Sequence, residues 1–171
     1  RQKGLELFIQ TNLYSYCPGL NKHKSELKNF AQLDCSIDNS LIAWTLLLHF
    51  LKKTTDEAEA FLRGWKCSKK EMTQVKLALF ALKPFDRQVL YQTGLEIALD
   101  VETMIGCLGF AVDVEAVKKM YEELPIYTKN EMKINGNDLQ TVLNQKPGKW
   151  LGELMTEIES AILKNEVSNE S

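Results

Sequence analysis

The most informative stretch of the chain runs from Leu124 to Leu154 and reads LPIYTKNEMKINGNDLQTVLNQKPGKWLGEL. It contains two turns, marked by Gly136 and Gly148, and each turn is followed by apolar residues at helical spacing. The first apolar face consists of Leu139, Val142 and Leu143, and the second of Leu151, Leu154, Ile158 and Ile162. The stretch therefore predicts a small helical hairpin.

The residues around the two glycines predict where the helices begin. Gly136 can adopt a positive φ without steric cost, and Asn137 is a suitable N-cap with Gln140 three residues further on. Pro147 suits the first position of the second helix, where its missing N–H is not needed. We therefore expect the helices to start at Asn137 and Pro147.

Lysines flank both turns, and the free N–H groups of a first helical turn attract anions. The candidate phosphate-binding residues are Lys133, Asn135, Gly136, Asn137, Lys146, Pro147, Gly148, Lys149 and Gly152. Phosphate contact and ordinary solvation both fit these lysines, and a hairpin that only packs is the plainer interpretation of the turns. Trp150 could stack on an unpaired base, but its place in an amphipathic first turn favours a core role.

The composition describes an ordinary globular protein of 171 residues, with 44% hydrophobic and 26% charged residues. The net charge of −2 gives no overall attraction to nucleic acid, but positive charge gathers in residues 1–53 (+3) and 124–150 (+2). No apolar run reaches the roughly 18 residues of a membrane span, so we expect no membrane partner. The first residue is Arg1, and we expect the chain to be a fragment of a longer protein.

The four cysteines, Cys17, Cys35, Cys67 and Cys107, are far apart and form no C-x-x-C motif. We expect free, buried thiols in a reducing cytoplasm, which is the predicted location.

The rest of the chain also reads as helix, and no alternating pattern suggests a sheet. Ser40, Thr54 and Ser68 are expected caps, the last two with Glu three residues on, and Pro84 is expected to end a helix. The expected helices are residues 1–10, 20–33, 41–51, 55–63, 69–82, 86–92, 95–108 and 114–124. We predict an all-α fold: an irregular helical body over residues 1–124 and a tail over 125–171 that frays from about residue 165.

The sequence offers little for catalysis. No G-x-S-x-G, phosphate-loop or zinc motif is present, and His23 and His49 are far apart. The pair Asp113-x-Glu115 lies at an expected helix start, where acidic residues favour the helix dipole. We expect no catalytic residue and no metal ligand in this chain.

Three phrases carry a resemblance to a known family. They are Leu-Pro-Ile at residue 124, Ile-Asn-Gly-x-Asp-Leu at residue 134 and Lys-Pro-Gly-x-Trp-Leu-Gly-Glu-Leu at residue 146. Together they resemble the C-terminal tail of the bacterial CCA-adding enzymes, which are tRNA nucleotidyltransferases of the class that includes the poly(A) polymerases. The match is dense over residues 124–163. Upstream, Asn12-Leu13-Tyr14 and Cys17-Pro18-Gly19-Leu20 resemble the family's entry into the body, with Cys-Pro in place of Leu-Pro.

The resemblance implies a function for the whole protein. In this family a catalytic head uses Mg²⁺ with CTP and ATP, and a neck with a Glu-Asp-x-x-Arg motif selects the nucleotide. Neither the head's carboxylate motif nor the neck motif occurs here. The chain would then be the tRNA-binding body and tail, which hold the tRNA elbow and acceptor backbone, and would be inactive alone.

Two other functions stay open. An independent helix-hairpin-helix module would bind nucleic-acid backbone through Pro147-Gly148-x-x-x-Gly152 with no enzyme attached, and the sequence before Arg1 would decide this. A helical protein-interaction domain would leave an apolar patch on the surface.

Overall fold

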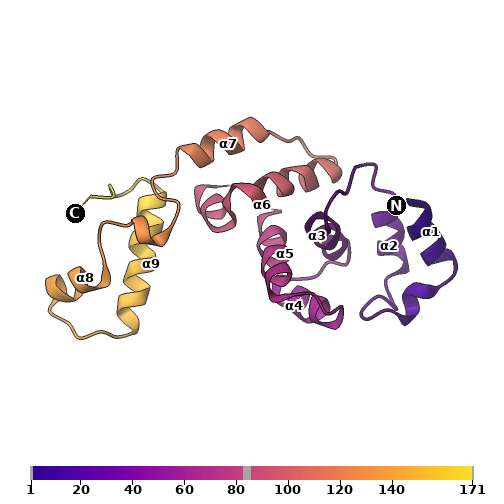
Figure 1. Ribbon diagram of the computed structural model, residues 1–171, viewed down its shortest axis with the longest axis horizontal. Helices are drawn as coiled ribbons and strands as arrows, with labels where there is room; N and C mark the ends of the chain where they lie inside the picture. Colours follow the sequence, from indigo (N-terminus) through magenta and orange to yellow (C-terminus); the bar gives the residue numbers. More distant parts are fainter. Residues whose placement is uncertain (1, 83–85, 171) are drawn as a thin grey trace. The chain divides into compact units, whose positions relative to one another are not determined.

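The computed structural model describes residues 2–82 and 86–170. These residues form nine α-helices and two short 3₁₀ turns and contain no strand, which confirms the all-α prediction (Figure 1). The expected stop at Pro84 lies outside the described residues. The chain divides into two compact units, Arg1–Pro84 with Glu96–Val114, and Phe85–Leu95 with Glu115–Ser171. The boundary predicted after Leu124 lies inside the second unit.

The first unit is built around one apolar helix. Its helices are α1 (Gln2–Gln10), η1 (Leu13–Tyr16), α2 (Lys24–Ala31), α3 (Ser40–Phe50), α4 (Thr55–Gly64), α5 (Lys69–Ala81) and the second half of α6 (Arg87–Cys107). Helix α3 packs against both α2 and α5. Three of its leucines, Leu46, Leu47 and Leu48, are buried in succession, so the helix is covered on most of its circumference.

Side-chain caps fix several helix starts. Thr54 and Ser68 form the predicted capping boxes with Glu57 and Glu71. The prediction for α3 was wrong by one residue: Asn39 is the N-cap, its side chain accepts from the Ile42 N–H at 2.9 Å, and Ser40 is already helical. Helix α2 is also shorter than the expected range 20–33, because turns occupy the residues before Lys24.

Helix α6 is interrupted where the sequence placed a break between two helices. Gly94 has φ 72° and ψ 166°, a conformation that is essentially restricted to glycine. The interruption coincides with the division between the units, since Phe85–Leu95 belongs to the second unit and Glu96–Val114 to the first.

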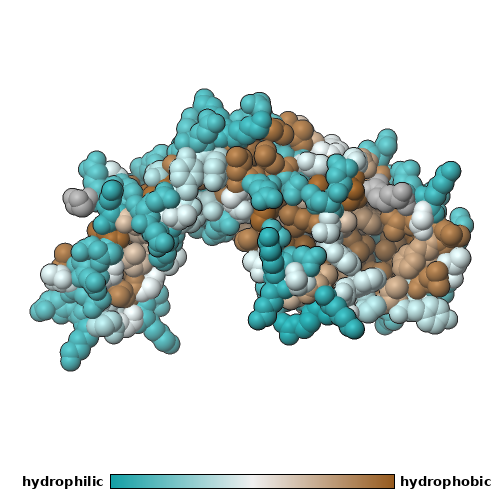
Figure 2. Space-filling view, in the orientation of Figure 1, coloured by the Kyte–Doolittle hydropathy of each residue, from teal (hydrophilic) through white to brown (hydrophobic). Residues whose placement is uncertain are grey.

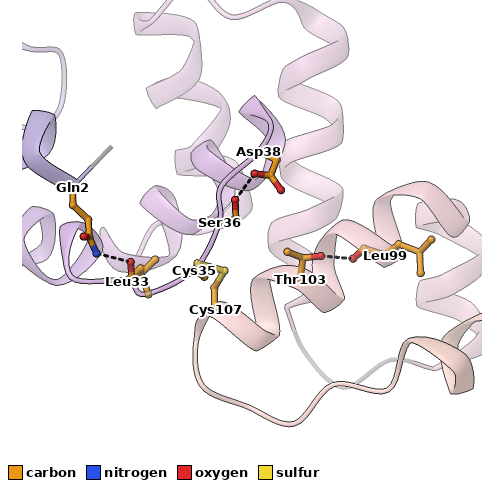
Figure 3. The surroundings of a disulfide bond; sticks show 8 residues. All are labelled: Gln2, Leu33, Cys35, Ser36, Asp38, Leu99, Thr103 and Cys107. Atoms are coloured by element: carbon orange, nitrogen blue, oxygen red, sulfur yellow. Dashed lines mark hydrogen bonds between the residues drawn. A yellow bond between two sulfur atoms is a disulfide. The ribbon is translucent and has the colours of Figure 1, made fainter.

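The expectation of four free cysteines was wrong. Cys35 and Cys107 form a disulfide between the α2–α3 loop and the last residue of α6 (Figure 3). Cys17 and Cys67 are free and partly exposed. The bonded residues are 72 positions apart, so only the packing of α6 against the earlier helices reveals the pair.

The second unit contains the predicted hairpin. It comprises the first half of α6, most of α7 (Val114–Glu122), η2 (Lys129–Glu131), α8 (Gly136–Leu143) and α9 (Lys149–Leu163). Helices α8 and α9 pack on each other and lie side by side in Figure 1. Leu139 of α8 and Ile162 and Leu163 of α9 are buried, so apolar residues at helical spacing supply the core.

Candidate nucleic-acid interface

The turn before α8 satisfies its own backbone. Asn135 is the N-cap, and its side-chain oxygen accepts from the N–H groups of Asn137 (2.8 Å) and Asp138 (3.3 Å). The Asp138 carboxylate accepts in return from the Asn135 N–H at 2.9 Å, which completes a capping box. The expected cap at Asn137 with Gln140 was therefore wrong: Asn137 is helical, and Gln140 donates to the Gly136 carbonyl oxygen.

This capping changes what the first turn can do. Two of its N–H groups are already bonded, and a carboxylate stands at the helix N-terminus, where it would repel a phosphate. The N–H of Lys133 is also bonded, to the side chain of Asn169. The groups of this turn that can meet a phosphate are therefore exposed side chains, such as the ammonium of Lys133.

Gly136 has a packing role. A Cβ at this position would come within 3.3 Å of Leu151 Cδ2 on α9, so the glycine lets the two helices of the hairpin approach closely. Gly136 could adopt a positive φ, but it does not do so here.

The turn before α9 is built differently. Gly148 is the N-cap in an extended conformation, it provides no side-chain cap, and helix α9 begins at Lys149. Pro147, predicted to be the first helical residue, lies two residues before the helix. Lys146, Pro147, Gly148 and Lys149 are all exposed. The N-terminus of α9 thus keeps its positive end of the helix dipole in solvent between two lysines.

Trp150 holds this second turn together. Its indole N–H donates to the Lys146 carbonyl oxygen at 2.9 Å, and a Cβ on Gly148 would lie 3.1 Å from its Cδ1 atom. The side chain is partly exposed, so it is neither the buried core anchor we favoured nor a free stacking platform. Its hydrogen bond to Lys146 closes residues 146–150 into one loop.

The remaining predicted residue, Gly152, lies on the exposed face of α9, and a Cβ there would meet no atom within 4 Å. In the region of α8 and α9, Figure 2 shows hydrophilic residues projecting from the visible face. The structure thus brings Lys146, Gly148, Lys149 and Gly152 onto one loop and the helix that follows, while Lys133 and Asn135 belong to the other turn.

Polar contacts connect the hairpin to the rest of the second unit. The hydroxyl of Tyr91 on α6 donates to the Glu159 carboxylate on α9 at 2.6 Å, and the Lys129 ammonium lies 3.7 Å from the same carboxylate. Asn169, in the stretch expected to fray, donates to the Glu131 carbonyl oxygen at 2.9 Å. These contacts give α9 and the end of the chain fixed neighbours within the second unit.

A second cationic surface, not expected from the sequence, lies on the first unit. A groove of about 350 Å³ between α4 and α5 is lined by Glu59, Arg63, Lys69, Met72, Thr73, Lys76 and Leu77. Glu59 accepts from both Lys76 and Arg63 at 2.8 Å, and the hydrogen bond from Lys76 is the main cause of the lowered pKa of this carboxyl. Three cations against one carboxylate leave the groove positive. The run Lys69-Lys70 one turn after Lys66 was the available signal, and hydrophilic side chains project below α4 and α5 in Figure 2.

Neither carboxylates nor other ligands in the described ranges suit a catalytic metal. Residues 2–82 and 86–170 hold no group of three His, Cys, Asp or Glu side chains that could bind an ion. Glu115 is paired with Lys118 at 2.8 Å, and the Asp113 N–H donates to Glu102. The donor set does not fit Mg²⁺ for nucleotidyl transfer, which needs close carboxylates. Among the described helices, none has the length and apolar character needed to cross a bilayer.

The family described as tRNA nucleotidyltransferase domain 2 matches residues 35–171, and the chain belongs to this family.

Its relatives identify the class of enzyme in which this domain occurs. The chain is similar to the CCA-adding enzyme of Enterococcus faecalis, with 34% identity across 99% of this chain and 43% of that protein. The CCA-adding enzyme of Bacillus cereus is 33% identical across 98% of this chain and 44% of that protein. A solved structure of the Bacillus stearothermophilus CCA-adding enzyme in complex with CTP matches with TM-score 0.84 and 29% identity, covering 99% of this chain and 45% of that one. The chain thus spans less than half the length of these relatives.

Proposed function

We propose that this chain is the tRNA-binding body and tail of a CCA-adding tRNA nucleotidyltransferase, and that it holds the tRNA so that the 3′ end reaches a catalytic head. The observation that carries the proposal is the family membership over residues 35–171, combined with a span of less than half of each CCA-adding relative. The whole protein would act on tRNA with CTP, ATP and Mg²⁺ in the cytoplasm. The donor groups of residues 2–82 and 86–170 do not suit the metal, so no step of the reaction is assigned to them.

The turn before α9 is the proposed main contact with tRNA phosphates. Its backbone has no side-chain cap, its dipole end is exposed, and Lys146 and Lys149 flank it. Gly148 has no side chain of its own to cover the backbone there. The turn before α8 would contribute through Lys133 and the exposed side chain of Asn137, since the Asn135–Asp138 capping box occupies its N–H groups.

Contacts of this kind read the shape of RNA through its phosphates. They add affinity with little dependence on base sequence. Three ammonium groups that neutralise about three phosphates would give a slope of roughly −2 to −3 for log affinity against log salt. The positive α4–α5 groove is a second proposed phosphate contact, on the first unit.

The test is tRNA binding by the 171-residue chain across a salt series. We expect Lys146→Ala with Lys149→Ala to weaken binding of every tRNA similarly and to flatten the salt slope by about two. Lys119→Ala with Lys164→Ala removes the same charge from exposed positions outside the turns and is the matched control. Equal affinities and slopes for both variants and the wild type would overturn the role of this turn.

A second experiment tests whether catalysis requires the head in addition to this chain. The purified chain should incorporate no labelled CMP or AMP into tRNA, whereas a protein that also carries the head should do so with Mg²⁺. Incorporation by the chain alone would contradict the proposal.

An exposed apolar pair favours one other function. Val142 is 80% exposed and Leu143 45% exposed on α8, next to the turn before α9. This pair would suit a protein partner. If Val142→Ser with Leu143→Ser leaves tRNA binding intact but abolishes a protein complex, this surface is a protein-binding site.

A further inference from the structure

The disulfide joins two segments that are distant in sequence. Cys35 lies in the α2–α3 loop, and Cys107 is the last residue of α6, with 5.4 Å between their Cα atoms. Figure 3 shows the bond at the point where the end of α6 meets this loop. The loop makes a further contact with α6 through Asn39, whose side-chain amide donates to Asp100 at 3.2 Å. That hydrogen bond is exposed, so the disulfide is the stronger tie between the two segments.

Both cysteines are within reach of small molecules. Cys35 and Cys107 are partly exposed, unlike an inert disulfide buried in a core. The segment that follows Cys107 is also open: Gly109 has φ 84° with no atom near its Cβ position, and Phe110 is 68% exposed. The disulfide thus lies between partly exposed residues and is followed in the chain by an exposed segment.

We propose that Cys35 and Cys107 form a redox-responsive modification site, which small disulfides oxidise and small thiols reduce in the folded chain. In the oxidation, one cysteine thiolate attacks a small disulfide, forms a mixed disulfide and releases one small thiolate. The second cysteine then attacks the mixed disulfide, the protein S–S bond forms, and a second small thiolate leaves. The protein loses two electrons and two protons, and the small disulfide becomes two thiols.

The oxidation state would set how firmly the second half of α6 is held. In the oxidised state the bond closes a long loop between residues 35 and 107 and restricts the unfolded chain, which stabilises the folded first unit. In the reduced state the exposed Asn39–Asp100 hydrogen bond and the buried side chains of Val101 and Met104 would have to hold α6 in place. The last turn of α6 and residues 108–113 would then open more easily. The folded first unit would thus be more stable under oxidising conditions and less stable under reducing conditions.

The test uses the 171-residue chain and glutathione as the probe. We expect oxidised glutathione to yield a protein that has lost two hydrogens, with a Cys35–Cys107 peptide pair in the digest. Reduction under native conditions should reverse this and lower the first unit's Tm by at least about 5 °C. Titration with mixtures of reduced and oxidised glutathione should convert the protein between the two states without loss of its helical circular dichroism signal.

Matched variants make the assignment specific. The variant with both Cys17→Ser and Cys67→Ser keeps the bonded pair and should respond to reductant like the wild type. The variant with both Cys35→Ser and Cys107→Ser should show no reductant-dependent shift of Tm. Four free thiols after treatment with oxidised glutathione would overturn the proposal. A bond that glutathione reduces only after the protein unfolds would overturn it as well, since the pair would then be a fixed structural link.

Discussion

The hydroxyl of Tyr91 donates a 2.6 Å hydrogen bond to the Glu159 carboxylate and so ties the first half of α6 to α9. Burial raises the pKa of the Tyr91 hydroxyl well above its ordinary value of 10.0, and the hydrogen bond to Glu159 adds to the shift. The tyrosine therefore stays a neutral donor throughout the physiological range. Lys129 approaches the same carboxylate from η2.

Tyr91→Phe removes this donor and leaves Glu159 with the more distant Lys129. We expect the free energy of unfolding of the second unit to fall by about 1–2 kcal/mol, because a hydrogen bond to a charged group is lost from a half-buried site. Urea denaturation monitored by a probe on α9 measures this loss of free energy of unfolding. Tyr127→Phe is the control, since the Tyr127 hydroxyl makes a longer, exposed bond of 3.3 Å to the Glu122 carbonyl oxygen. An equal loss in both variants would rule out a special role for the Tyr91–Glu159 bond.

Gly94→Ala should be destabilising although the space around Gly94 is open. A Cβ there would meet no atom within 4 Å, so the cost comes from the backbone conformation, φ 72° and ψ 166°. We expect a loss of about 1–3 kcal/mol in the free energy of unfolding. Gly152→Ala is the control: it also adds a methyl group in open space, but within a helix, and should raise stability by up to about 1 kcal/mol. Similar effects of both changes would contradict this account.

The sequence could predict those local features in which one residue decides the structure. Thr54 and Ser68 are each followed by a glutamate three residues later, and this pattern predicted a capping box at each site. Both capping boxes are present in the structure. The sequence pattern placed the cap at Asn137, whereas Asn135 is the N-cap and the Asp138 carboxylate accepts from its N–H. Gly136 lies close to Leu151 of α9, and this tertiary contact is not visible in a local pattern.

Features that depend on distant segments could not be predicted. The Cys35–Cys107 bond joins residues 72 positions apart, and spacing alone gave no reason to pair them. The α4–α5 groove is lined by side chains of two helices, with Lys76 of α5 paired to Glu59 of α4, and the lysine run in the sequence does not show which helix lies beside it. Similarly, Trp150 fitted a core position by periodicity, and only the loop geometry shows that its N–H closes on Lys146.

The two capping boxes of the first unit predict an acid dependence of its stability. The backbone N–H groups of Thr54 and Ser68 donate to the carboxylates of Glu57 and Glu71, and these bonds hold the pKa of each glutamate below its ordinary 4.5. The unfolded chain therefore binds more protons in this range. The stabilising contribution is fully present above about pH 4.5 and is lost as the pH falls through the folded pKa values.

Urea midpoints between about pH 6 and pH 3 measure this dependence. The variant with Glu57→Gln and Glu71→Gln keeps a side-chain acceptor at both caps but cannot titrate. We expect it to be less stable than the wild type at the upper end of the range and to lose less stability on acidification. An identical pH dependence in both proteins would show that the caps do not contribute to acid sensitivity.

Trp150→Phe tests whether the turn before α9 must be held in one shape to bind tRNA. The change keeps an aromatic ring over Gly148 but removes the N–H that donates to the Lys146 carbonyl oxygen. Residues 146–149 would then sample more conformations, and their lysines and N–H groups would have to be ordered on binding. We expect tRNA affinity to fall by about five-fold, corresponding to the loss of about 1 kcal/mol from one hydrogen bond.

The salt series distinguishes this effect from loss of charge. Trp150→Phe keeps Lys146 and Lys149, so the slope of log affinity against log salt should stay that of the wild type, whereas the double lysine variant should flatten it. Far-ultraviolet circular dichroism and the Tm of the second unit serve as the folding control. Wild-type affinity in Trp150→Phe would mean that the Trp150–Lys146 hydrogen bond stabilises only the fold of the hairpin. The lysines would then bind phosphates without needing a fixed loop conformation.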